Sequence, residues 1–154
     1  MGEYELRFER FSRELFDDYL GWFADAELNR RLGPMDDEWL TAILDESEEQ
    51  GMTWAVFASS ELVGVIETVF SPGLPCAITA IAVKPSRLRQ GLARSMLQRL
   101  FADYEVRGIE SYVAYVEQTN VAASRLLINE GFWAISGPND KGYVEFRRES
   151  GAGG

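Results

Sequence analysis

The chain has 154 residues, of which 46% are hydrophobic and 26% are charged, and its formal net charge at pH 7 is −10. This length favours a single domain with a buried core. The acidic balance argues against general nucleic-acid binding, and no apolar run approaches the ~18 residues of a membrane span. The opening segment MGEYELRFER lacks the pattern of a signal peptide, so we expect a cytoplasmic protein that binds neither nucleic acid nor membranes.

Two residue types restrict the chemistry. The chain has no histidine, which excludes Ser-His-Asp and Cys-His catalysis and His-ligated metal sites within it. Its one cysteine, Cys76, allows no intrachain disulfide and no multi-cysteine zinc site, so we expect no metal. We predict that Cys76 is a buried structural thiol. Carboxylates, tyrosines, backbone amides and the substrate's own groups remain for catalysis.

The N-terminal half predicts one strand, then two helices, and then a β-hairpin. Alternating apolar and charged residues over 4–11 indicate a first, half-buried strand. Ser12 is expected to begin a helix that ends near 31–34, where Gly-Pro stops it. A second helix is predicted over 36–51, and the hairpin strands are predicted over 52–58 and 62–70.

The C-terminal half alternates strands and helices. The apolar run 76–83 predicts a central strand that is buried on both faces. Apolar residues at helical spacing follow over 91–107, and the next strand is expected over 109–116. The remaining elements are a short helix over 120–131 and strands over 132–136 and 143–149.

The predicted fold class is therefore α/β, with a mixed central sheet of about seven strands and four helices. Residues 1–149 are expected to form one domain, and residues 150–154 a flexible tail.

Basic residues accumulate in one stretch, KPSRLRQGLARSMLQRL over 84–100, which contains no acid. The five are Lys84, Arg87, Arg89, Arg94 and Arg99. They indicate either an anion site or the solvated face of an amphipathic helix. A turn that leads into a helix N-terminus offers unpaired backbone N–H groups to a phosphate, and Gly91 allows close approach there. The stretch matches neither GxxxxGK[ST] nor GxGxxG.

A family resemblance favours the anion site. IAVKPSRLRQGLARSML resembles the acetyl-CoA pyrophosphate motif of the GNAT superfamily of N-acetyltransferases, and NVAASRLLINEGF (120–132) is similar to its second signature. The resemblance implies a GNAT-like sheet in which strands 76–83 and 109–116 splay apart. It also implies acetyl-CoA as cosubstrate, with strand backbone along the pantetheine arm and a cradle for the pyrophosphate. The implied cofactor-binding residues are Ile81, Ala82, Val83, Arg89, Gln90, Gly91, Leu92, Ala93, Arg94 and Asn120.

Each assignment has a structural alternative. Asn120 is also the expected N-cap of the helix that it begins. Two positions depart from the family pattern: Leu88 stands where Arg or Gln is usual, and Leu127 stands where a tyrosine is usual. Three residues are candidates for proton handling, Tyr115, Glu67 and Glu117, and each of them is also compatible with a structural role.

The expected function is transfer of an acetyl group to a primary amine by direct attack in a ternary complex. The acidic surface favours a cationic acceptor, either a small amine or a peptide N-terminus, and a homodimer is possible. Leu88 and Leu127 favour the alternative, a CoA-binding regulatory or interaction module with weak or no catalysis. Transfer of another acyl group is a third option. The aromatic residues that would line an acceptor pocket, unless they form the core, are Trp22, Phe23, Trp39 and Trp133.

Overall fold

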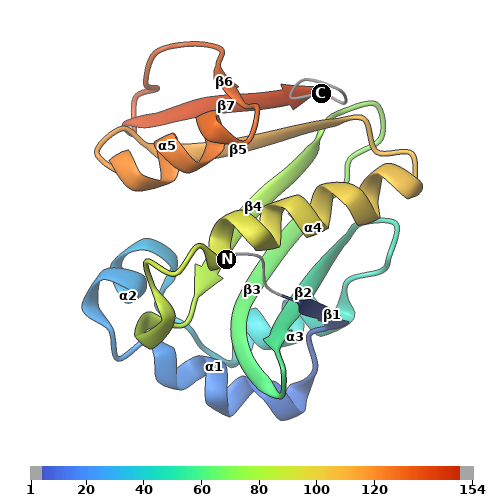
Figure 1. The fold of residues 1–154 in the computed structure, drawn as a ribbon, viewed down its shortest axis with the longest axis vertical. Coiled ribbons are helices and arrows are strands. Elements are labelled where there is room, and N and C mark those ends of the chain that lie inside the picture. The colour runs from blue at the N-terminus through green and yellow to red at the C-terminus, as the bar shows by residue number, and fades with distance from the viewer. Residues whose placement is uncertain (1–4, 150–154) are drawn as a thin grey trace.

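The computed structural model describes residues 5–149, which form a seven-stranded mixed sheet with strand order β1-β2-β3-β4-β5-β7-β6 (Figure 1). The strands are β1 Leu6–Arg10, β2 Gly51–Ala58, β3 Glu61–Val69, β4 Cys76–Val83, β5 Ser111–Glu117, β6 Trp133–Ala134 and β7 Tyr143–Glu149. The α-helices are α1 Phe16–Trp22, α2 Ala26–Leu32, α3 Asp37–Asp45, α4 Leu92–Val106 and α5 Val121–Asn129. None of these helices is both long and apolar enough to cross a lipid bilayer.

The predicted fold class is confirmed, although the described residues contain five α-helices instead of four. The predicted helix after Ser12 divides into a short 3-10 turn and two α-helices, because the Asp25 side chain accepts a hydrogen bond from Leu28 N (3.0 Å) and begins α2. The predicted helix 36–51 is too long, since Glu46 adopts extended backbone and ends α3. The expected tail 150–154 lies outside the described residues.

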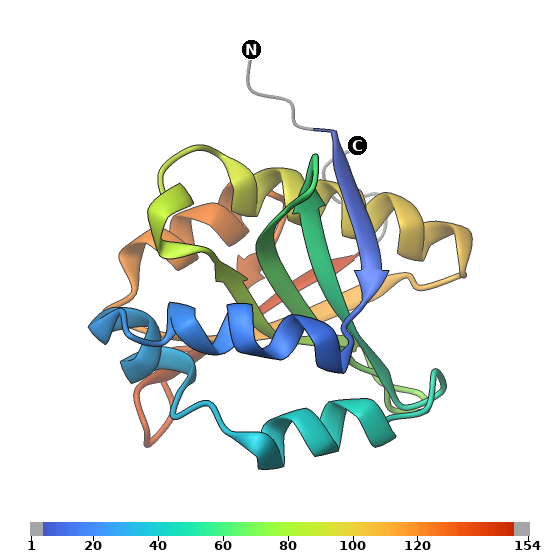
Figure 2. The same cartoon turned by 90° about the horizontal axis from the view of Figure 1, so that it is seen from below.

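The two faces of the sheet have separate apolar cores. One core packs α4 and α5 against the sheet and includes Leu97, Leu100 and Leu127. The other core lies beneath α1 and α3, which cross the face of β1–β4 in Figure 2, and includes Tyr19 and Leu40. Burial of these side chains fixes both helical layers to the sheet, at about 25 cal/mol per Å² of apolar surface.

Strands β4 and β5 separate along most of their length. They are parallel and pair only at Cys76↔Tyr112 and Ala77↔Val113, and beyond these residues they diverge toward the N-terminal end of α4 (Figure 1). The splayed geometry implied by the sequence resemblance is therefore confirmed. The β4 edge from Thr79 to Val83 has no strand partner on the β5 side among the described residues.

The prediction that β4 is buried on both faces is wrong in part. Thr79 is exposed, and Ile81 and Val83 are only half-buried, because the neighbouring strand has moved away from this end of β4. Thr79 also interrupts the pairing with β3, where Glu67 lies opposite Ala80 and Thr68 lies opposite Ile78. The irregularity bends the strand at the point where β4 and β5 begin to separate.

Candidate active site

The N-terminal end of α4 faces open space. Gly91 is its N-cap, with φ of 78°, a left-handed conformation that favours glycine. A Cβ atom at this glycine would meet no atom within 4 Å. Side chains of Asp25, Asp36 and Asn120 cap α2, α3 and α5, whereas no side chain caps α4. The first N–H groups of α4 therefore remain available to an anion at the positive end of the helix.

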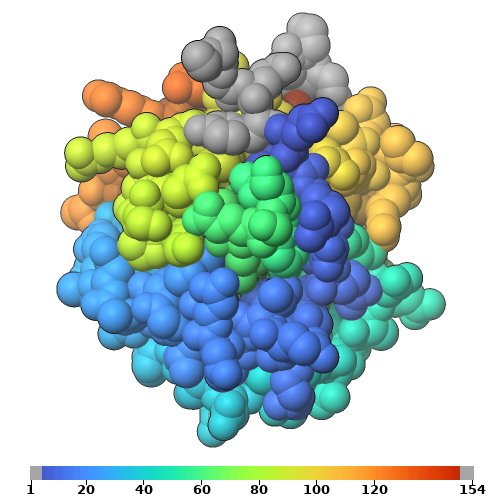
Figure 3. Space-filling view, turned by 60° about the horizontal axis from the view of Figure 1, so that its bottom comes forward, coloured from blue at the N-terminus to red at the C-terminus, as the bar shows by residue number. Residues whose placement is uncertain are grey.

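The loop before Gly91 has mostly paired charges. Lys84 Nζ lies 3.2 Å from Glu61 Oε2, and Arg87 also pairs with Glu61. Figure 3 shows this yellow-green loop at the surface, against the green β2–β3 hairpin. Glu61 is the first residue of β3 in that hairpin. Arg99 pairs with Asp103 at 3.1 Å. The acids that neutralise the basic stretch come from outside it, which is why the sequence alone overstated its charge.

Arg89 and Arg94, on either side of Gly91, differ in their ion pairing. Arg94 Nε lies 3.1 Å from Glu130 Oε2, a side chain that is only 7% exposed, so Arg94 is tied to the end of α5. Arg89 is exposed and forms no ion pair or hydrogen bond with the described residues. Its φ of 63° is unusual for a residue other than glycine. Such backbone strain is typical of functional turns.

The second motif supplies a cap and a core residue. Asn120 Oδ1 accepts a hydrogen bond from Ala123 N at 3.2 Å, so this side chain caps α5 as the structural alternative expected. Leu127 is 2% exposed and belongs to the core beneath α4 and α5. A cofactor contact by Asn120 remains a prediction.

Glu67 lies on the α1–α3 face of β3. Its Oε2 accepts a hydrogen bond from the indole Nε1 of Trp39 at 3.1 Å. Burial raises the pKa of Glu67, the Trp39 hydrogen bond lowers it, and Glu46 nearby raises it further. Sequence reasoning identified Glu67 and Trp39 separately, but no spacing rule joins residues 28 positions apart.

Tyr115 and Glu117 both lie on the splayed part of β5. Tyr115 is 57% exposed and is opposite Glu145 on β7. Since Ala114 and Val116 pack into the core beneath α4 and α5, Tyr115 and Glu117 point to the other face of the sheet. Glu117 Oε2 lies 3.4 Å from Arg30 Nη1, which ties β5 to α2. That ion pair had no counterpart in the sequence interpretation.

The aromatic candidates divide between core and surface. Trp22 is 5% exposed and therefore belongs to the core. Phe23 and Trp39 are half-buried beside it, while Trp133 is 45% exposed on β6. Trp39 is the one of the four that touches a proton-handling candidate.

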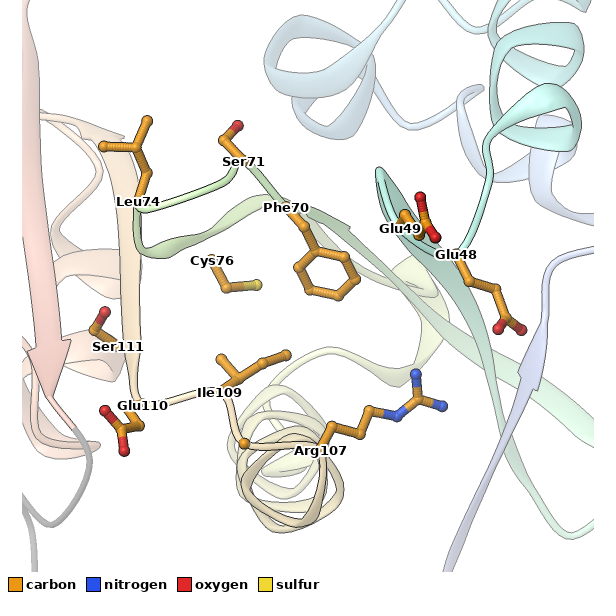
Figure 4. A pocket seen from close by; sticks show the side chains of 11 residues that line it. Glu48, Glu49, Phe70, Ser71, Leu74, Cys76, Arg107, Ile109, Glu110 and Ser111 are labelled. Carbon is orange, nitrogen blue, oxygen red and sulfur yellow. The ribbon is translucent and has the colours of Figure 1, made fainter.

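A cavity of about 490 Å³ lies at the closed end of the β4–β5 pair (Figure 4). Phe70, Cys76 and Ile109 surround it, and Arg107 lies at its rim. Burial raises the pKa of Cys76 to about 12, so this thiol is inert near neutral pH. The whole 15-residue helix α4, about 22 Å long, separates this cavity from the Gly91 end. The cavity and the predicted phosphate site therefore lie at opposite ends of α4. The N-terminal end is better suited to a phosphate, because its backbone N–H groups have no side-chain cap.

Comparisons with known proteins agree with this architecture. A family model described as the acetyltransferase (GNAT) family matches residues 8–132. No curated protein sequence gives a significant match.

Solved structures with this fold are numerous. An acetyltransferase from Salmonella typhimurium that modifies the N-terminal serine of a 50S ribosomal subunit protein is 17% identical, with TM-score 0.82 and 94% coverage of both chains. An acetyltransferase from Thermus thermophilus is 15% identical, with TM-score 0.81 and coverage of 97% of this chain and 99% of that one. Spermidine N-acetyltransferase from Vibrio cholerae, solved with CoA and spermine, is 13% identical, with TM-score 0.79 and 96% coverage of both chains.

Proposed function

This chain belongs to the acetyltransferase (GNAT) family, and we propose that it transfers an acetyl group from acetyl-CoA to a primary amine. The observation that best supports this proposal is the divergence of β4 and β5, which leaves the β4 edge from Thr79 to Val83 without a strand partner, together with the N-terminal end of α4, which no side chain caps. An extended cosubstrate arm fits along an unpaired strand edge, and a diphosphate fits at free helix N–H groups. The cavity near Phe70 is less suited to the diphosphate, because the carboxylates of Glu48 and Glu49 line it.

Residues of β4, of the segment 89–94 and at the start of α5 would hold acetyl-CoA. The backbone of Ile81, Ala82 and Val83 would bind the pantetheine arm, since this edge of β4 has no strand partner. The pyrophosphate would lie against the segment 89–94, which comprises Arg89, Gln90, Gly91, Leu92, Ala93 and Arg94. Arg89 would donate directly, whereas Arg94 would have to share its guanidinium with Glu130. Asn120 would contribute its Nδ2, because its Oδ1 caps α5.

The proposed reaction is a direct attack in a ternary complex. An acceptor amine that arrives protonated loses one proton to a carboxylate, for which Glu67 is the first candidate and Glu117 the second. The neutral nitrogen then attacks the thioester carbonyl, and a backbone N–H of β4 stabilises the oxyanion. The carbon–sulfur bond breaks, CoA leaves as a thiolate, and the nitrogen passes its remaining extra proton through water to the Tyr115 oxygen, which restores the phenol after it has protonated the thiolate. Tyr115 would donate a proton to the thiolate. Leu127, which is buried and stands where a tyrosine is usual in the family, has no hydroxyl group with which to do so.

A cationic acceptor fits the carboxylates around this side of the sheet. Glu67, Glu117 and Glu145 all belong to the face opposite α4 and α5, and the chain has 25 acidic against 15 basic residues. Glu117 pairs with Arg30 and Glu145 with Arg147, so Glu67 is the one of the three without an ion-pair partner among the described residues. Two of the structural neighbours act on, or are solved with, amines of this kind, a polyamine and a protein N-terminus. We therefore propose a polyamine-like amine or a peptide N-terminus as the acceptor.

The test is an assay of CoA thiol release from acetyl-CoA with a panel of polyamines, amino sugars and short peptides. We expect amine-dependent release for at least one of them, with the acetylated amine identified by mass spectrometry. Acetyl-CoA binding without release for any amine would support instead the CoA-binding module that the substitutions Leu88 and Leu127 favour. Absence of both binding and release would refute the proposed function.

A further inference from the structure

Trp39 holds the carboxylate of Glu67 from outside the sheet. Building on the proposed function, we propose that Trp39 is a positioning residue that orients Glu67 and keeps it able to accept the proton of the acceptor amine. The residues belong to different layers, since Glu67 is on β3 and Trp39 is in the first turn of α3. Their contact is a hydrogen bond of 3.1 Å from the indole Nε1 to Oε2.

The indole has little freedom to turn away. Asp36 caps α3 and accepts a hydrogen bond from Trp39 N at 3.1 Å, which fixes the backbone of the tryptophan. Its ring contacts Phe11 edge-on, with centroids 5.2 Å apart, and Tyr19 at 5.2 Å. Phe16 stacks on it at 6.2 Å. The N–H group is therefore directed at Glu67 by packing that exists before any substrate binds.

Few other groups act on this carboxylate. Its strand neighbours are Thr53 on β2 and Ala80 on β4, neither of which is charged. From the helical layer, Tyr19 of α1 and Glu46 after α3 are the titratable groups that act on it electrostatically. Within residues 5–149, Glu67 has no ion-pair partner and no hydrogen-bond donor to its carboxylate other than Trp39.

A neighbouring hydroxyl is left without a partner. The Tyr19 OH is fully buried and makes no hydrogen bond with the described residues. A buried polar atom of this kind carries a free-energy cost. It gives the carboxylate of Glu67 no hydrogen bond, which leaves the Trp39 indole as the donor that acts on Glu67 among the described residues.

The two influences on Glu67 oppose each other. Burial raises the pKa of Glu67, and the Trp39 hydrogen bond lowers it because that bond stabilises the anion. A raised pKa makes a carboxylate a stronger proton acceptor, and a hydrogen bond to the anion favours its ionised form. Loss of the indole N–H would leave burial unopposed and raise the pKa of Glu67 further.

The experiment compares the pH dependence of kcat/KM for the wild-type protein and Trp39→Phe, with an accepted amine. Phenylalanine keeps an aromatic ring and removes only the donor and part of the ring area. We expect the acidic limb to move to higher pH by about one unit. The indole hydrogen bond favours the ionised form of Glu67 by an energy that corresponds to about one pKa unit. At the alkaline plateau the variant should recover most of its activity, which a merely structural defect would not do.

Trp54→Phe is the matched control. Trp54 Nε1 donates to Tyr104 OH at 2.8 Å, so the substitution removes the same kind of bond on the face of the sheet opposite to the Glu67 carboxylate. Its acidic limb should coincide with that of the wild-type protein. Glu67→Gln should abolish the limb and lower kcat/KM at every pH. A limb that persists unchanged in Glu67→Gln would overturn the inference even if Trp39→Phe failed to fold.

A second readout separates this inference from the proposed function. The Glu67 carboxyl is titrated by NMR in protein labelled with ¹³C at glutamate, and its resonance is assigned by its loss in Glu67→Gln. The pKa of Glu67 should be higher in Trp39→Phe than in the wild-type protein. An unchanged pKa would overturn the positioning role whether or not any amine is acetylated, whereas a raised pKa without turnover would leave it standing and refute only the proposed function.

Discussion

Arg94 lies 3.1 Å from Glu130, so a cation in the first turn of α4 is already neutralised by the residue that follows α5. Arg89, five positions earlier, has no such partner among the described residues. The two arginines belong to the same basic stretch in the sequence and carry the same formal charge. Their different surroundings give them different expected contributions to CoA binding.

We predict that Arg89→Gln weakens acetyl-CoA binding by about tenfold, because a charge-assisted hydrogen bond to phosphate is lost. Arg94→Gln, the matched control, should weaken binding by a smaller factor, since Arg94 must give up Glu130 to reach a phosphate. Calorimetric titration at low and high salt measures both. Equal losses for the two variants would mean that the pairing with Glu130 does not decide the contribution.

Gly91→Glu should abolish detectable acetyl-CoA binding, because its side chain would occupy the open space before the first N–H groups of α4. The substitution also has a conformational cost of about 1–2 kcal/mol, since φ at Gly91 is 78°. Gly108→Glu is the matched control at the other end of the helix. Gly108 has φ of 86° and equally open surroundings, so this variant should lose similar stability and keep its CoA affinity.

Tyr115→Phe should lower kcat by about 100-fold while acetyl-CoA affinity stays nearly constant, because only the proposed proton donor is removed. Steady-state kinetics with an accepted amine, under conditions in which chemistry limits turnover, provide the measurement. Tyr143→Phe removes a hydroxyl from β7, from a side chain that is 37% exposed, and should retain wild-type kcat. Wild-type kcat in Tyr115→Phe would remove Tyr115 from the mechanism.

Glu67→Gln should stabilise the fold near neutral pH. The pKa of Glu67 in the folded state is raised above its ordinary value of 4.5, which means that folding favours the protonated carboxyl. The resulting contribution to the free energy of unfolding is fully present below pH 4.5 and is lost as the pH rises through the folded-state pKa. The gain in Tm of the variant over the wild-type protein should therefore shrink on acidification. Thermal melts from about pH 3 to about pH 8 measure it.

Glu27→Gln is the control of opposite sign. Hydrogen bonds from Arg30 and Arg31 lower the pKa of Glu27 to about 2, so its carboxylate stabilises the folded state above its ordinary pKa of 4.5. That contribution is lost as the pH falls through about 2. This variant should be slightly less stable than the wild-type protein near neutral pH, because the ion pair is exposed. The same sign for both variants would contradict the assigned environments.

Local patterns were sufficient to predict most of the fold. The run 76–83 and the helical spacing after Gly91 correspond to β4 and α4 almost residue by residue. The predicted helix boundaries were wrong where a residue inside an expected helix begins a new one. Asp25 is such a residue, because its side chain caps the start of α2.

The site was harder to predict because its groups meet through tertiary contacts. Glu61, at the start of β3, neutralises Lys84 and Arg87, which lie more than 20 residues away in the chain, and Arg30 pairs with Glu117 across 87 positions. Charge density in a short window does not register such partners. Alternation along β5 left the direction of Tyr115 open, and the packing of Ala114 and Val116 against α4 and α5 resolves it.

Hydrogen–deuterium exchange with and without acetyl-CoA tests most directly whether the cosubstrate binds between β4 and β5 at the N-terminal end of α4. We predict increased protection of the amides over 79–83, the β4 edge without a partner on the β5 side, and over 89–94, the segment that begins α4. Peptides around Phe70 and Ile109, at the cavity by the other end of α4, should exchange at the same rate in both states. Protection confined to that cavity, or no change anywhere at saturating acetyl-CoA, would contradict this account.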